Sequence, residues 1–292
     1  MTDDFRPREE RRFLAGFALV SLAAVGVGCA VAAHHGAPGS SWMRNLVAWI
    51  VGALVAWAAA MRVKRLTGFL LVAPAALAAT LLNPAQEGVH RWIDVGRVHT
   101  NAAAVLLPAS VVALAALRDR RWAWLSAAVM LGLLVVQPDA SQAAALAAGM
   151  LAILASLSAP VLVRVGAAGI VVFAALVASI RPDPLAPVPE VEGIMKIAFD
   201  GSLFTGLFAV FALSTALFYP LRLGSSAQPS TPALALTACF CMQAVAPVFG
   251  AFPVPLVGVG MSPILGFLLG AGALAAAHRS AASAEADGGA AG

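Results

Sequence analysis

The chain has 292 residues, of which 61% are hydrophobic and only 11% are charged, with a formal net charge of +4. Soluble domains carry about 25% charged residues, so this composition excludes an ordinary soluble enzyme, a disordered chain and a disulfide scaffold. The long Ala-, Leu-, Val- and Gly-rich stretches predict a helical membrane protein, because backbone polar groups in lipid must be satisfied within each segment. The net charge does not indicate nucleic-acid binding.

We predict an all-α integral membrane protein with about ten transmembrane helices and both termini in the cytoplasm. The first apolar run is about 20 residues long, which exceeds the usual ~7–15 residues of a signal peptide, so we expect a retained span. Residues 1–280 form one membrane domain, and residues 281–292 are expected to be a disordered tail. The predicted spans are residues 14–34, 44–61, 66–82, 101–117, 122–136, 142–162, 165–180, 194–218, 232–249 and 256–277.

The distribution of basic residues predicts the orientation of these spans. Cytoplasmic loops are enriched in Lys and Arg, and ten spans place most of the 18 basic residues on one side. The inner group is Arg6, Arg8, Arg11, Arg12, Arg62, Lys64, Arg65, Arg118, Arg120, Arg121, Arg164, Arg222 and Arg279; the outer group is Arg44, Arg91, Arg97, Arg181 and Lys196. The outer loops carry most of the histidines and prolines, and six carboxylates at Glu87, Asp94, Asp139, Asp183, Glu190 and Glu192, so we expect the functional face there.

Arg91 and Trp92, in the outer loop at residues 87–96, form the first candidate site. An Arg next to a Trp at the membrane interface can hold a phosphate while the ring lies at headgroup depth. An interfacial anchor in which Arg91 pairs with Asp94 or Glu87 explains the same residues.

The second candidate is the turn at residues 137–142, which contains Gln137, Pro138 and Asp139. Pro138 ends one helix, and Asp139 is a residue type that caps the start of the next. Asp139 is therefore either a helix cap at a membrane turn, a site residue, or both.

The third candidate is the proline-rich outer loop at residues 181–193, with the carboxylates Asp183, Glu190 and Glu192. A carboxylate there could act as a general base on a sugar hydroxyl or hold a divalent ion; a solvated acidic loop is the alternative. In the following helix, Lys196 either pairs with Asp200 at i, i+4 or meets a lipid phosphate.

The fourth candidate, residues 247–263, is rich in proline and glycine and predicts a broken helix before the last span. Irregular backbone at membrane depth is tolerated where it is buried in protein or lines a cavity, so packing and site roles both remain open. The spacings of the histidines and cysteines indicate no metal site.

These four segments, in this order on a ten-span frame, resemble the SEDS family (shape, elongation, division and sporulation), the FtsW- and RodA-like membrane glycosyltransferases that polymerise peptidoglycan from lipid II. The resemblance covers residues from about 14 to 277. Its motifs are residues 88–96, 137–139, 189–190, 247–250 and 253–255.

The resemblance implies a protein of the bacterial inner membrane that acts on an undecaprenyl-linked sugar at the outer face. Arg91 would hold the diphosphate, Glu192 or Glu190 would deprotonate the acceptor hydroxyl, and Asp139 would shape the cavity. Magnesium or another divalent cation would assist transfer, and the implied partner is a class B penicillin-binding transpeptidase.

The chain departs from the family pattern in several places, which include a shorter loop before residue 194 and the absence of the Gly-Glu-Glu that follows the family's aspartate. Ile194 aligns with the aspartate regarded as catalytic in the family, and the entry to the fourth span, residues 101–104, lacks the family's Glu and Lys. Glycosyl transfer, lipid binding or scaffolding without catalysis, and transport of a lipid-linked substrate therefore remain alternatives.

Overall fold

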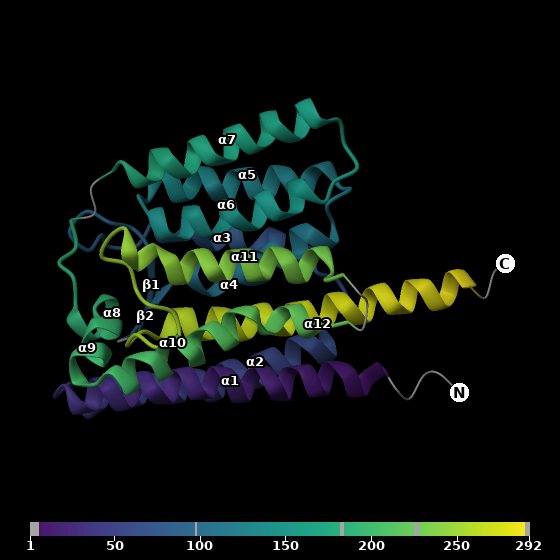
Figure 1. Cartoon of the computed structure of the whole chain (residues 1–292). Coiled ribbons are helices and arrows are strands. Elements are labelled where there is room, and N and C mark those ends of the chain that lie inside the picture. Colours follow the sequence, from purple (N-terminus) through teal and green to yellow (C-terminus); the bar gives the residue numbers. More distant parts are fainter. Residues whose placement is uncertain (1–5, 97, 182–183, 225–227, 290–292) are drawn as a thin grey trace.

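The computed structural model describes residues 6–96, 98–181, 184–224 and 228–289. These residues form a bundle of helices with one short hairpin (Figure 1). The α-helices are α1 Arg6–His34, α2 Gly39–Arg62, α3 Thr67–Thr80, α4 Ala102–Ala116, α5 Arg121–Val136, α6 Ala140–Ala155, α7 Val161–Ser179, α8 Pro189–Glu192, α9 Ile194–Gly201, α10 Leu203–Phe218, α11 Thr231–Val245 and α12 Met261–Gly289. The strands are β1 Trp92–Val95 and β2 Val98–Asn101, and the 3-10 turns are η1 Tyr219–Arg222 and η2 Ala246–Val248.

The fold is that of an all-α multi-pass membrane protein, as predicted. In the described residues, α1, α2, α7, α10 with η1, α11 with η2, and α12 are long and apolar enough to cross a membrane. The apolar helices α3, α4, α5 and α6 have only 14–16 residues, or about 21–24 Å, less than the ~30 Å hydrocarbon core.

One predicted span is two helices in the structure. The expected helix at residues 194–218 is divided into α9 and α10 at Ser202, whose backbone is extended and whose hydroxyl accepts the N–H of Thr205 (3.0 Å). Ser is a preferred N-cap because its short side chain satisfies a free helix amide. The break follows Asp200 and Gly201, which are residue types that disfavour the helix interior, but the long apolar runs on either side of residues 200–202 favoured one continuous span.

The hairpin is a second difference from the predicted elements. β1 and β2 pair antiparallel, with Trp92 opposite Asn101. Gly96, between the strands, has a φ of +63°, a conformation that glycine adopts without a Cβ clash. Trp92, Ile93 and Val95 are residue types that favour strands, but four residues are too few to stand out between two apolar runs.

Helix α12 is the most buried of the long helices. In its most apolar window 83% of the residues are buried, compared with 11% for α7, which lies at the edge of the bundle (Figure 1). A Cβ on Gly266 would lie 1.9 Å from the Ala104 carbonyl oxygen, and one on Gly272 would lie 2.6 Å from that of Ala56. The two glycines therefore let α12 pack directly on the backbones of α4 and α2.

The two ends of the bundle differ in structure. The beginning of α1 and the end of α12 lie at one end, and the hairpin, α8 and α9 lie at the other (Figure 1). We call these the inner and outer ends, following the predicted orientation. Helix α12 continues to Gly289, into the segment expected to be disordered, because its alanines favour helix and no proline interrupts them. Residues 290–292 lie outside the described part of the chain.

Candidate functional site

A cavity of about 350 Å³ opens at the outer end of the bundle, and residues from all four candidate segments line it. Arg91 and Trp92 come from the hairpin, Asp139 from the turn before α6, Glu192 from α8, and Pro253 from the segment before α12. Its further polar lining residues are Gln86, His99, Asn101, Ser141, Gln142, Gln243 and Ser262. Segments separated by more than 150 positions in the sequence thus form one outer cavity.

The side chain of Arg91 pairs with the turn before α6. Its Nη2 donates a hydrogen bond to the carbonyl oxygen of Pro138, and its Nε lies 3.8 Å from Oδ2 of Asp139. Both charged side chains are buried, where an ion pair interacts more strongly than at a surface but costs desolvation. Of the expected partners, Asp94 instead bonds His99 (2.7 Å).

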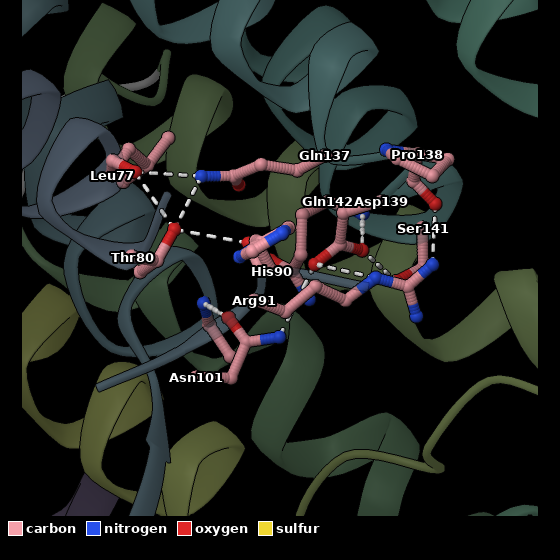
Figure 2. A network of polar contacts seen from close by, with 11 residues as sticks. Leu77, Thr80, His90, Arg91, Asn101, Gln137, Pro138, Asp139, Ser141 and Gln142 are labelled. Atoms are coloured by element: carbon pink, nitrogen blue, oxygen red, sulfur yellow. Dashed lines mark hydrogen bonds and ion pairs between the residues drawn. The ribbon is translucent and has the colours of Figure 1, made fainter. Parts of the chain in front are cut away.

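Asp139 connects three elements (Figure 2). Its Oδ1 accepts the N–H of Gln142 (3.3 Å), which makes it the N-cap of α6, and its Oδ2 accepts Nδ2 of Asn101 (3.1 Å). Asn101 caps α4 by accepting the N–H of Ala104 (2.9 Å), and its own N–H donates to Oγ of Ser262 (3.0 Å). Asp139 is therefore both a helix cap and a cavity residue.

Asn101 and Ser262 were not predicted as site residues. Asn101 directly precedes an apolar run, which is the sequence signal of an N-cap, and this signal could have identified it. Ser262 has no comparable signal, because its position beside Asn101 depends on how α12 packs on α4.

Gln137 does not line the outer cavity. It is buried, and its Nε2 donates to the carbonyl oxygen of Leu77 (2.6 Å) and to Oγ1 of Thr80 (2.6 Å). Thr80 in turn donates to the carbonyl oxygen of His90 (2.9 Å), next to Arg91. Gln137 therefore fixes the end of α5 to α3, behind the Arg91–Asp139 pair (Figure 2).

The two carboxylates of α8 lie in different surroundings. Glu192 lines the outer cavity, and its Oε2 accepts the N–H of Val188 (2.6 Å). Glu190 lies 3.2 Å from Nδ1 of His35 and lines a neighbouring cavity that also contains Arg44. Of the two predicted catalytic carboxylates, only Glu192 faces the cavity that contains Arg91.

Backbone hydrogen bonds attach α8 to the segment before α12. Val259 N–H donates to the carbonyl oxygen of Glu190 (2.9 Å), and Val254 N–H donates to that of Val191 (3.1 Å). A Cβ on Gly258 would lie 2.5 Å from the Val191 oxygen, so this close contact requires glycine. The irregular proline- and glycine-rich segment thereby lines the cavity and holds α8 against it.

The remaining predicted site residues are dispersed. Lys196 is exposed on α9, forms no ion pair with Asp200, and does not line the outer cavity. Ile194, at the position of the family's aspartate, is completely buried. Asp183 lies outside the described residues.

The outer cavity contains too few ligands to hold a metal ion with protein groups alone. Within the described residues, no three His, Cys, Asp or Glu side chains lie close enough together to form such a site. The carboxylates that line the cavity are Asp139 and Glu192, and Asp139 already contacts Arg91 and Asn101.

The chain has a RodA-like fold. It is similar to two crystal structures of the Thermus thermophilus rod shape determining protein RodA, one of them a mutant, with 17–18% sequence identity and a TM-score of 0.68. The match covers 90% of this chain and 96% of RodA. A chain from a structure described as "Structural coordination of polymerization and crosslinking by a peptidoglycan synthase complex" matches with 18% identity and a TM-score of 0.67, over 90% of this chain and 97% of that one. No protein-family model and no curated protein matches the chain.

Proposed function

We propose that this chain is a divergent member of the SEDS family in the bacterial inner membrane, where it binds an undecaprenyl-linked sugar diphosphate during peptidoglycan synthesis. The observation that carries the proposal is the convergence of Arg91, Asp139 and Glu192 on the outer cavity. The RodA-like fold, which extends over 90% of the chain, supports it, and residues from the four candidate segments line the cavity.

The chemistry of the outer cavity suits a sugar diphosphate. Its volume of about 350 Å³ lies within the roughly 300–1,000 Å³ of small-molecule sites. The guanidinium of Arg91 is the group for the phosphates, and the amides of Gln142 and Gln243 and the hydroxyl of Ser262 offer hydrogen bonds to sugar hydroxyls.

A divalent cation belongs to this proposal as part of the bound substrate. The cavity is lined by one arginine and two carboxylates, so its net charge is negative and repels an incoming diphosphate. Magnesium is commonly held largely by substrate phosphates and water, so the bound diphosphate would supply most of the ligands of the cation and the cation would offset this negative charge.

Glu192 is the proposed general base for glycosyl transfer. It would accept the proton of the acceptor hydroxyl as the acceptor oxygen bonds to the anomeric carbon and the bond to the diphosphate breaks. Glu190 lies on the other side of α8, beside His35, and we assign it to holding that segment in place.

Lipid binding without turnover is the second candidate function. It is favoured by Ile194, which offers no proton acceptor where the family has its aspartate. In either case a class B penicillin-binding transpeptidase is the proposed partner; a structural neighbour comes from a peptidoglycan synthase complex.

The two candidates are separated by assaying purified protein with lipid II and magnesium for both binding and polymer formation. If the chain is a transferase, wild type forms polymer, Glu192→Gln retains lipid II but forms at least a hundredfold less polymer, and Arg91→Ala loses binding. If it is a binding protein, wild type binds lipid II and forms no polymer.

Glu190→Gln is the matched control, because it neutralises a carboxylate of the same helix outside the outer cavity. We expect it to change polymer formation less than threefold. Absence of lipid II binding by the folded wild-type protein would refute both candidates.

A further inference from the structure

A second large cavity lies at the inner end of the bundle. Its volume is about 630 Å³, and it is lined by the segment after α2, the end of α4, the start of α11 and residues 274–281 of α12. Its charged and titratable lining residues are Lys64, Arg65, Arg118 and His278. We call it the basic cavity.

Among the side chains that the structure describes, no carboxylate lines the basic cavity. In the described part of the chain, neither Lys64 nor Arg65 forms an ion pair, and Arg118 contacts only backbone oxygen, that of Ala115 (3.3 Å). Glu10 of α1 is the acidic group in contact with the lining; it is buried and lies 3.3 Å from His278 Nδ1. Three cations from two separate loops thus line one cavity, and none of them is paired with a carboxylate of the described residues.

The remaining lining adds hydroxyl groups and an apolar wall. Ser230 and Thr231 lie at the start of α11, where the helix dipole contributes partial positive charge. Leu66, directly before α3, and Leu274 of α12 also line the cavity. A cationic, hydroxyl-lined space beside apolar side chains matches a phosphate headgroup with the beginning of its acyl chains.

The positive-inside rule does not by itself produce such a cavity. That rule requires basic residues near the ends of spans, and Arg120 and Arg121 satisfy it as exposed residues that do not line the cavity. Lys64, Arg65 and Arg118, by contrast, lie around a common space between helices. Basic pockets between transmembrane helices on the cytoplasmic side are sites where anionic lipid headgroups bind.

We propose that the basic cavity binds the phosphate-bearing headgroup of an anionic phospholipid from the inner leaflet. The ligand chemistry is a phosphate diester, held by Lys64, Arg65 and Arg118. The site lies at the opposite end of the bundle from the outer cavity, so it does not depend on the proposed enzymatic function.

The proposal is tested by native mass spectrometry of the full chain, titrated in detergent with phosphatidylglycerol or with phosphatidylcholine. Wild type is expected to bind one phosphatidylglycerol at least tenfold more tightly than phosphatidylcholine. Lys64→Gln/Arg65→Gln, and separately Arg118→Gln, are expected to reduce this preference at least fivefold. Glycerol 1-phosphate, a soluble phosphate, should fail to displace the lipid at millimolar concentration; displacement would support the phosphate site but assign it to a soluble anion.

Arg120→Gln/Arg121→Gln is the matched control, since it removes the same charge from the same end of the bundle. We expect it to change the preference less than twofold. An equal loss in the control, or no preference in wild type, would overturn the proposal. Unchanged thermal unfolding of each variant is required before its binding is compared.

Discussion

At the scale of single residues, the outer cavity depends on a buried ion pair, Arg91 and Asp139, which also connects the start of α6 to the start of α4. Asp139 caps α6, accepts a hydrogen bond from Asn101 and faces Arg91. Removing one member of a buried pair is costly because the other charge stays buried without its partner.

Asp139→Asn and Arg91→Gln are each expected to lower the free energy of unfolding by about 3–5 kcal/mol. The double variant should be less destabilised than the sum of the two, because neither charge is then left alone. Denaturant or thermal unfolding in detergent, analysed as a double-mutant cycle, measures this. Strictly additive effects would show that the two side chains do not interact.

Gln137 supports the site without contacting it. Gln137→Leu removes donors to the Leu77 carbonyl and to Thr80, and leaving buried acceptors unpaired costs about 1–3 kcal/mol. We expect reduced thermal stability with unchanged lipid II affinity in the protein that remains folded. A large fall in affinity at full stability would place Gln137 in the binding site after all.

At the scale of secondary-structure elements, α12 positions the floor of the outer cavity by direct backbone contact with α4. Gly266 approaches Ala104, and Ala104 itself lines that cavity. A side chain at Gly266 must therefore separate the two helices, since the obstructing atom belongs to the backbone.

Gly266→Ala is expected to lower the free energy of unfolding by about 1–3 kcal/mol through overpacking and to weaken lipid II binding. Gly169→Ala on α7 is the control, because nothing lies within 4 Å of its Cβ position. That change should be neutral or stabilising by up to about 1 kcal/mol. Equal melting temperatures for the two variants would contradict the close α12–α4 contact.

At the scale of the whole molecule, the same two helices connect cavities of different chemistry. Helices α4 and α12 contribute Ala104 and Ser262 to the outer cavity, and Ala116 and Leu274 to the basic cavity. The outer cavity and the basic cavity therefore lie at opposite ends of the bundle. The positive-inside rule predicts that the end with the basic cavity faces the cytoplasm.

This orientation is testable with two conservative substitutions in a variant whose three native cysteines are replaced. Ser40→Cys at the start of α2 and Ser156→Cys after α6 are both exposed, at opposite ends of the bundle. A membrane-impermeant maleimide added to intact spheroplasts should label Ser40→Cys, and label Ser156→Cys only after permeabilisation. The reverse labelling pattern would show that the protein has the opposite orientation, with the outer cavity facing the cytosol.

The sequence by itself determined the membrane class, most helix positions and the two differing ends. These follow from local quantities: the length of apolar runs, the spacing of basic loops, and cap residues such as Asp139. It also identified the four segments that meet at the outer cavity.

Only the tertiary structure decided which polar groups meet. Glu190 and Glu192 are two residues apart, which on a helix is a rotation of about 200°, so one faces the outer cavity and the other faces His35. Arg91 pairs with Asp139 rather than with Asp94 or Glu87 because the hairpin turns its side chain toward the start of α6. Such contacts depend on how distant helices pack, and a single sequence carries no local signal for them.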